Sequence, residues 1–217
     1  QVVISGRRQA QLDAVVKSAQ DEGLRLHAVA MDICDHASVR RAAAAVHERF
    51  GAVDTLVNSA ATNVAHRAWA RIDAAGFEEV VATNLTGTMY CMLAVLPGMR
   101  EQRNGLIINI ASLAGKFVSP LTGPSYTAAK HAVGALTQSL NTEECVNGIR
   151  ACAIFPGEVA TPMLQTRAVM PTAEEQARML QPDQVAAAVR FVAEMPGGPC
   201  VNEILIRPAW KRSLAPV

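Results

Sequence analysis

The stretch Leu106-Ile107-Ile108-Asn109-Ile110, followed directly by Ala111 and Ser112, is the strongest strand signal in the sequence. A strand with one solvent-exposed face shows strict alternation of apolar and polar residues. This apolar run lacks that alternation, so it predicts a strand buried on both faces. A helical pattern from about Tyr126 to Val146 follows, and then a second apolar strand over 149–155. Strand, helix and strand in this order form the repeating unit of a parallel sheet.

The same alternation extends outward in both directions. Further strands are expected at 2–5, 24–31, 55–57 and 203–206, and further helices at about 12–23, 39–50, 75–99 and 184–193. Residues 160–180 are polar and irregular. We therefore predict one α/β domain over residues 1–217, with a doubly wound, mostly parallel sheet covered by helices on both faces.

Composition excludes several classes of function. The chain has 217 residues, a net charge of +1 and no Lys/Arg-rich run, so no nucleic-acid partner is expected. The five cysteines and five histidines show no metal-ligand spacing, which predicts no metal site, no disulfide framework and a cytoplasmic location. The uncharged stretch 80–99 contains Thr83, Asn84 and Pro97, so we expect no membrane span. We also expect no secretion signal, because no charged segment followed by an apolar one is seen at the start.

Tyr126 and Lys130 are the first candidates for chemistry. They are four residues apart, so on a helix their side chains share one face. A nearby ammonium lowers the pKa of a tyrosine from its usual value of about 10 and makes it a usable general acid/base. Ser112, directly after the strongest strand, can hydrogen-bond a substrate oxygen. The alternatives are a solvated lysine beside a half-buried tyrosine, and a serine that only caps a turn.

In their order, these motifs resemble those of the classical short-chain dehydrogenases/reductases. The matching pieces are Asp32-Ile33, Asp54 to Ala61, Thr83-Asn84-Leu85, Ile108 to Ser112, Tyr126-Thr-Ala-Ala-Lys130 and Phe155 to Pro162. The likeness covers essentially the whole chain. It implies a Rossmann-like fold and hydride transfer between a nicotinamide cofactor and a small alcohol or carbonyl substrate, without a metal.

The resemblance also implies roles for single residues. Tyr126 would be the catalytic acid/base, Lys130 would lower its pKa and hold the nicotinamide ribose, Ser112 would orient the substrate, and Asn84 would anchor a relay water. The residues implied to border the cofactor, besides Tyr126 and Lys130, are Asp32, Ile33, Asn58, Ala60, Pro156, Gly157, Val159 and Thr161. Residues 160–181 would form a substrate lid. The helices around Asn84 and Tyr126 would form the interface of a homodimer or homotetramer.

Cofactor choice can be argued from the end of the first visible strand. A carboxylate there would accept the ribose 2′-hydroxyl of NAD(H). The sequence instead reads Ser5-Gly6-Arg7-Arg8, and the guanidinium groups of Arg7 and Arg8 suit a 2′-phosphate. NADP(H) is therefore favoured over NAD(H). The alternative is that both arginines are solvated residues at a helix start.

The chain departs from the family pattern at the nucleotide loop. None of its 14 glycines stands in a G-x-G-x-x-G or G-x-x-x-G-x-G spacing, the turn that presents backbone N–H groups to the pyrophosphate. The family's first strand, between those at Val2 and Thr55, is missing as well. We therefore expect a chain truncated at its N-terminus, unstable or inactive as it stands, in which these two strands each have an unpaired edge.

Substrate identity stays open at this point. The ending 203–208 is similar to that of family members acting on 3-hydroxy acids or serine, but 3-oxoacyl, sugar and steroid substrates are also compatible with it. The alternative function is a non-catalytic short-chain-dehydrogenase-like module for dimerisation or regulation. Against it, Asn84, Ser112, Tyr126 and Lys130 are all present.

Overall fold

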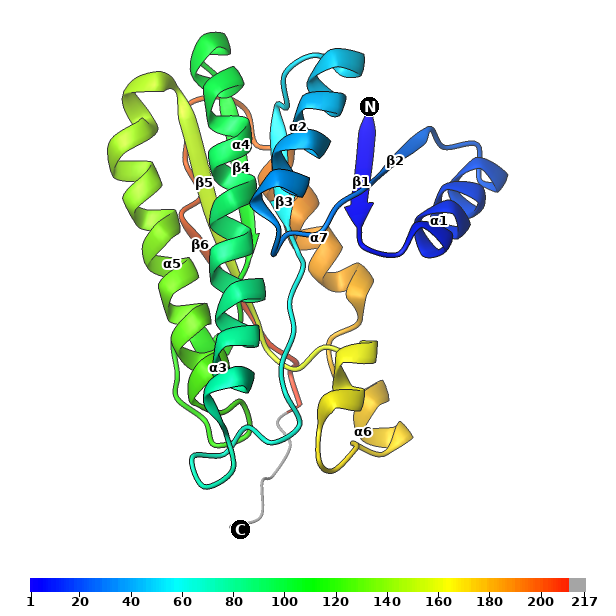
Figure 1. The fold of residues 1–217 in the computed structure, drawn as a ribbon, viewed down its shortest axis with the longest axis vertical. Helices are drawn as coiled ribbons and strands as arrows, with labels where there is room; N and C mark the ends of the chain where they lie inside the picture. The colour runs from blue at the N-terminus through cyan, green and yellow to red at the C-terminus, as the bar shows by residue number, and fades with distance from the viewer. Residues whose placement is uncertain (211–217) are drawn as a thin grey trace.

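Parallel strands form the centre of the structure, a computed structural model that describes residues 1–210 (Figure 1). The strands are β1 (Val2–Gly6), β2 (Leu26–Ala30), β3 (Thr55–Asn58), β4 (Gly105–Ile110), β5 (Ile149–Pro156) and β6 (Glu203–Ile206). Each hydrogen-bonded pair is parallel. The strand positions predicted from the sequence are therefore confirmed to within a few residues.

The strands lie in two separate groups. β3, β4, β5 and β6 form a four-stranded sheet in that order, and β1 pairs with β2 alone. Within residues 1–210, β1 and β3 therefore each have one edge without a strand partner, as the sequence predicted. Val2 on β1 is 57% exposed and Val57 on β3 is 41% exposed, whereas Ile107 and Ile108 on β4 are buried.

Helices cover the strands and complete the α/β alternation. They are α1 (Gln9–Asp21), α2 (His36–Phe50), α3 (Ala74–Val81), α4 (Gly87–Gln102), α5 (Pro124–Glu144), α6 (Ala173–Ala177) and α7 (Pro182–Ala193). Gly51, with φ of 84°, ends α2, and Pro124 occupies the first turn of α5. Both residues favour helix ends for reasons of backbone conformation, so these boundaries are readable from the sequence.

The four-stranded sheet is buried on both faces. On one face, Met92 and Leu96 of α4 and Leu140 of α5 pack against Ile107. On the other, Val192 of α7 packs in a cluster with Leu106, Ile108, Cys152 and Ile154. Successive side chains of β4 thus enter opposite cores, which explains its continuous apolar run and confirms a Rossmann-like α/β fold.

One helical stretch, Ala74–Gln102, is long and apolar enough to cross a membrane by length and composition. Its residues Met92, Leu96 and Met99 are instead part of the core beneath the sheet. We therefore interpret it as a helix of the folded domain. The sequence predicted one regular helix here, but α3 and α4 are joined by a π-helical turn, Ala82–Thr86.

Residues 160–181 contain more structure than the sequence led us to expect. A 3₁₀ turn, Pro162–Thr166, is followed by α6, and Val159 forms a parallel bridge with Leu180. The prediction of an irregular segment was therefore wrong for α6. Its signal is the capping box, in which Thr172 and Glu175 satisfy each other's backbone N–H groups.

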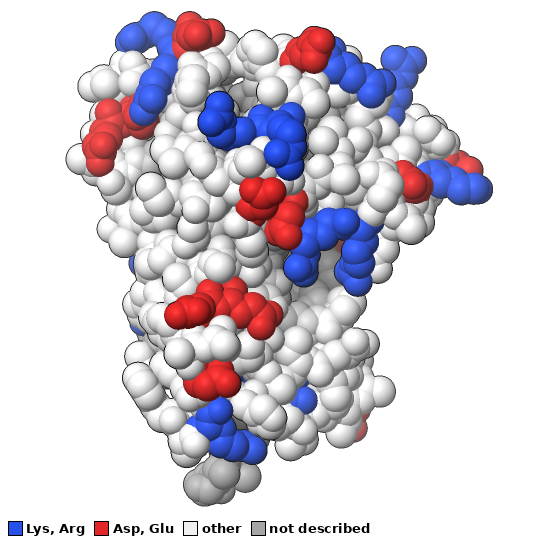
Figure 2. Space-filling model, in the orientation of Figure 1, with Lys and Arg blue, Asp and Glu red and all other residues white. Residues whose placement is uncertain are grey.

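Charged side chains of both signs are interspersed over the face shown in Figure 2. Neither sign forms a continuous field on this face, in keeping with the net charge of +1.

Candidate active site

The carboxyl ends of the strands bring the predicted site residues towards one edge of the fold. Ser112 follows β4 closely, Gly157 follows β5 directly, and Tyr126 lies in the first turn of α5. This edge is where ligands bind in open α/β sheets. In Figure 1 the 160–181 segment, drawn in yellow to orange around α6, lies at the same lower end of the molecule as the start of α5.

Tyr126 is buried at the centre of this edge, with 9% of its surface exposed. Its ring packs in a cluster with Val80 and Ala114, against which Val64 and Met163 also pack. The side chain of Ser112 acts on the Tyr126 hydroxyl and lowers the pKa of the tyrosine. The Ser112 hydroxyl also accepts a hydrogen bond of 3.1 Å from the Ala114 backbone N–H. The structure thus brings Ser112 and Tyr126 together, as predicted.

Lys130 lies one helical turn beyond Tyr126 and is 2% exposed. Its Nζ donates a hydrogen bond of 2.8 Å to the backbone oxygen of Ile110, at the end of β4. The same nitrogen is 5.7 Å from the centre of the Tyr126 ring. Burial lowers the pKa of Lys130 to about 8, because a low-dielectric surrounding disfavours the ammonium.

The pKa of Tyr126 is raised from its ordinary value, because burial of the phenolate outweighs the influences that lower it. Those influences are the Ser112 side chain and the positive charges of Arg67 and Arg167. Lys130 is not among these influences, so its effect on the pKa of Tyr126 stays a prediction. Sequence reasoning missed both arginines, since they lie in loops without periodicity, 59 and 41 positions from Tyr126.

Asn84 is completely buried in the π-helical turn. Its side-chain Nδ2 donates to the Thr62 carbonyl at 2.9 Å, and its Oδ1 accepts from the Thr62 N–H at 2.7 Å. The backbone oxygen of Asn84 accepts a hydrogen bond of 3.0 Å from Thr88. The Asn84 side chain therefore fastens the loop after β3 to the helix, and its role towards a relay water stays a prediction.

Two pairs of predicted cofactor residues lie at the ends of β1 and β2. Arg7 and Arg8 follow β1, and both are exposed. Asp32 follows β2, and its Oδ1 accepts a hydrogen bond of 2.9 Å from the Cys34 N–H. Ile33 packs so closely against the start of α4 that a Cβ on Gly87 would lie 2.7 Å from its Cγ1.

The remaining predicted cofactor residues follow β3 and β5. The Asn58 Nδ2 donates a hydrogen bond of 2.9 Å to Asn109 Oδ1, so this side chain links β3 to β4. Ala60 is exposed. Pro156 ends β5, and the Gly157 N–H donates to the Ile206 oxygen at 2.8 Å. Thr161 begins the 3₁₀ turn that follows Val159. All of these residues lie at the carboxyl ends of strands or beyond them.

A parallel, doubly covered sheet with a buried tyrosine, a buried lysine and a half-buried serine at its carboxyl edge defines a Rossmann-like oxidoreductase of the nicotinamide-dependent class. The family model for short chain dehydrogenases matches residues 1–171. The chain therefore belongs to the short-chain dehydrogenase family and is an NAD(P)-dependent oxidoreductase of it.

Individual relatives agree with this placement. An uncharacterized oxidoreductase of Staphylococcus saprophyticus is 34% identical over 208 residues, covering 95% of this chain and 86% of that protein. A 2-(R)-hydroxypropyl-CoM dehydrogenase of Xanthobacter autotrophicus is 38% identical over 182 residues, covering 80% and 71%. The closed form of a serine dehydrogenase complexed with NADP+ superimposes with a TM-score of 0.84 at 26% identity, covering 100% and 89%.

Proposed function

We propose that this protein transfers a hydride between NADP(H) and an alcohol or carbonyl substrate, with Tyr126 as the general acid/base. The observation that carries the proposal is the buried Tyr126, with the Ser112 side chain acting on its hydroxyl and the buried Lys130 one helical turn away. A 3-hydroxy or 3-oxo acid is the substrate type that we favour, in agreement with the likeness to a serine dehydrogenase.

Each residue of the group has a definite task. A nicotinamide cofactor held at this edge would supply or accept the hydride. In the reducing direction, Tyr126 donates its proton to the substrate oxygen, and Ser112 donates a hydrogen bond to that same oxygen. The raised pKa of Tyr126 keeps the phenol protonated at neutral pH, ready for this donation. Lys130, with a pKa of about 8, is mostly charged at pH 7 and stabilises the phenolate that forms.

The preference for NADP(H) rests on the end of β1. Arg7 and Arg8 are exposed there, where NAD(H) would require a carboxylate. Asp32 and Ile33 would border the adenine, and Lys130 would hold the nicotinamide ribose. The other residues proposed to line the cofactor are Asn58, Ala60, Tyr126, Pro156, Gly157, Val159 and Thr161. A glycine-rich pyrophosphate turn has no counterpart among the 217 residues.

The unpaired edges of β1 and β3 support a second part of the proposal. We propose that a further parallel strand pairs with both edges and carries the glycine-rich turn. The exposed Val2 and Val57 would then become buried. A segment that supplies this strand should raise the melting temperature and create NADP(H) binding. If protein with and without the segment melted and bound alike, the proposal would fail.

The wider organisation is proposed on similar grounds. Residues 1–217 form one domain, with 160–181 as its substrate lid, in a cytoplasmic enzyme. Met89 and Leu93 of α4 are 43% and 47% exposed, which supports a homodimer or homotetramer joined through α4 and α5. The mass of the protein in solution tests the oligomeric state.

NADPH oxidation with a panel of carbonyl compounds tests the function. The unsubstituted protein is compared with Tyr126→Phe and with Tyr90→Phe. Tyr90, the other tyrosine of the sequence, lies in α4 and stacks on His36 of α2. We expect Tyr126→Phe to lower kcat by about 100-fold or more and Tyr90→Phe to leave it unchanged. Equal turnover by all three would refute the role of Tyr126. Neither turnover nor NADPH binding would favour the non-catalytic module.

A further inference from the structure

The positive charges of two guanidinium groups, from segments far apart in the sequence, act on Tyr126. Arg67 lies in the loop that follows β3, and Arg167 lies in the 160–181 segment. The positive charge of each one acts on the Tyr126 hydroxyl and opposes the rise in its pKa. Neither arginine belongs to the family motifs found in the sequence. Both can therefore contribute to the substrate specificity of this particular protein.

The position of Arg67 is fixed at both ends. Its backbone packs against Gly123, at the start of α5, so closely that a Cβ on this glycine would lie 2.8 Å from the Arg67 Cβ. Gly123 has φ of 75°, which also favours glycine. At the other end, the Arg67 Nη2 donates hydrogen bonds to the Thr166 carbonyl and, at 3.0 Å, to the Thr166 hydroxyl. Arg67 therefore spans from the start of α5 to the 160–181 segment.

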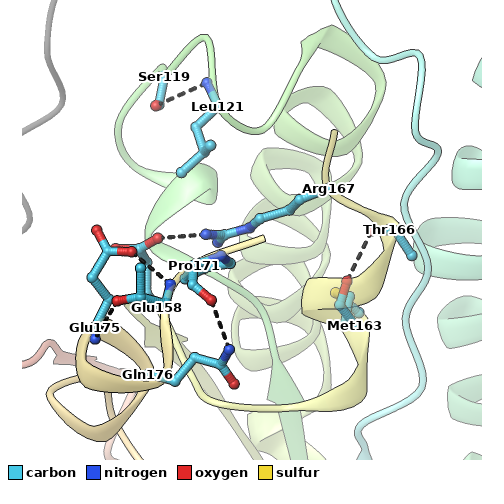
Figure 3. A network of polar contacts seen from close by, with 10 residues as sticks. Ser119, Leu121, Glu158, Met163, Thr166, Arg167, Pro171, Glu175 and Gln176 are labelled. Atoms are coloured by element: carbon cyan, nitrogen blue, oxygen red, sulfur yellow. Dashed lines mark hydrogen bonds and ion pairs between the residues drawn. The ribbon is translucent and has the colours of Figure 1, made fainter. Parts of the chain in front are cut away.

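Arg167 is the next residue along that segment, and its side chain is 14% exposed. Its Nη1 pairs with Glu158 at 2.8 Å, and Figure 3 shows this side chain pointing at the Glu158 carboxylate. Met163, in the same 3₁₀ turn as Thr166, packs against the cluster that contains Tyr126. The segment thus holds Arg167 in place beside the site.

The two arginines leave the site with an excess of positive charge. Glu158 pairs with Arg167, but within residues 1–210 Arg67 has no carboxylate within ion-pair distance. Burial lowers the pKa of Arg67, which shows that its cation has lost part of its hydration. A partly desolvated cation without a counter-ion is unfavourable, and an anionic ligand would compensate it.

We propose that Arg67, assisted by Arg167, binds the carboxylate of the substrate, so that the preferred substrates are oxo and hydroxy acids. A planar guanidinium matches a carboxylate through two parallel hydrogen bonds. Within residues 1–210, the hydrogen bonds of the Arg67 side chain all come from Nη2. Its other N–H groups can therefore donate hydrogen bonds to a carboxylate. The inference rests on the proposed function, because the carboxylate is placed relative to a carbonyl at Tyr126.

Matched acids and amides test the proposal. Reduction of acetoacetate is compared with that of acetoacetamide, and reduction of pyruvate with that of pyruvamide, since each pair differs mainly in charge. We expect the acid of the better pair to have a kcat/KM about 10- to 100-fold above that of its amide. Arg67→Met should remove this advantage and Arg167→Met should reduce it, because each variant lowers kcat/KM more for the acid than for its amide.

Arg190→Met is the matched control, because Arg190 forms an exposed ion pair with Glu194 on α7. It should behave like the wild-type protein. A loss of equal size for acid and amide in Arg67→Met would mean that Arg67 only holds the 160–181 segment, and would overturn the proposal. So would acids that are no better than their amides.

Calorimetric binding of the acids and amides in the presence of NADP+ gives a readout independent of turnover. We expect acids to bind more tightly than amides, and Arg67→Met to abolish the difference. Amides reduced as well as acids, in a reaction that needs Tyr126, would refute the anion site and leave the proposed function standing. Arg67-dependent acid binding without any turnover would refute the proposed function alone. No binding difference and no preference in turnover would refute the anion site.

Discussion

The ammonium of Lys130 lies 5.7 Å from the centre of the Tyr126 ring, and its hydrogen bond goes to the Ile110 backbone oxygen. Both side chains are buried, at 2% and 9% exposure. The lysine is therefore held by the end of β4, and burial shifts the pKa values of both groups. This arrangement places a titrating charge beside the proposed acid/base.

Lys130→Met should reveal that titration through stability. The folded protein releases the Lys130 proton near pH 8, whereas the unfolded chain keeps it to about pH 10.5. Between these values the unfolded state binds more protons, so the free energy of unfolding of the wild type rises with pH. Relative to the variant, the wild type should gain up to about 3 kcal/mol from pH 7 to pH 10.5. Urea unfolding measures this difference, and a value independent of pH would contradict the burial of a charged Lys130.

Asn109→Leu should destabilise the junction of β3, β4 and α5. The Asn109 side chain is buried, accepts a hydrogen bond from Asn58 and donates one of 2.9 Å to Thr137. Leucine would leave buried polar groups without partners, at a cost of about 1–3 kcal/mol in the free energy of unfolding. The exposed Ser139→Ala should cost less than about 0.5 kcal/mol and serves as the control in thermal unfolding. Equal effects would show that the network contributes nothing.

Glu144→Gln should weaken the contact between α4 and α5 in a pH-dependent way. Hydrogen bonds from Arg100 and Asn147 lower the pKa of Glu144 to about 2. The stabilisation is therefore present above the usual pKa of 4.5 and disappears as the pH falls through about 2. Because Arg100 is 48% exposed, we expect a loss of only about 1 kcal/mol at pH 7. An equal loss at pH 2 and pH 7, by denaturant titration, would exclude this ion pair as the cause.

Arg7→Ser should weaken NADPH binding and spare NADH binding. A guanidinium beside the 2′-phosphate contributes charge-assisted hydrogen bonds, so we expect the Kd of NADPH to rise about 10-fold or more. Arg25→Ser is the matched control, because Arg25 lies between the C-terminal end of α1 and the start of β2. Fluorescence titration with both cofactors measures the change. Equal weakening of NADPH and NADH would point to a general effect rather than 2′-phosphate recognition.

Much of the fold could be predicted because burial on both faces leaves a continuous apolar run in the sequence. β4 and β5 were found in this way, and Gly51 marked the end of α2 through its backbone preference. The π-helical turn around Asn84 could not be predicted, since its hydrogen bonds to Thr62 form only once the loop after β3 folds back on the helix. Tertiary contacts decide that geometry.

The site shows the same division. Tyr126, Lys130 and Ser112 are tied to helix spacing and to the end of a strand, so the sequence predicted their proximity. Arg67 and Arg167 approach Tyr126 from loops, and nothing in their local sequence marks them. What recognises a particular substrate is therefore the part of the site that only the folded chain brings together.

Transfer of deuterium from labelled NADPH tests the central claim most directly. Protein that includes the proposed further strand and glycine-rich turn is given the best carbonyl substrate and NADPH that carries deuterium at either position of nicotinamide carbon 4, and the alcohol is analysed by NMR. The account predicts one deuterium on the new carbinol carbon from only one of the two labelled cofactors, with the Tyr126→Phe reaction slowed at least about 100-fold. An alcohol without deuterium from either cofactor, or no alcohol at all, would contradict a hydride-transferring oxidoreductase.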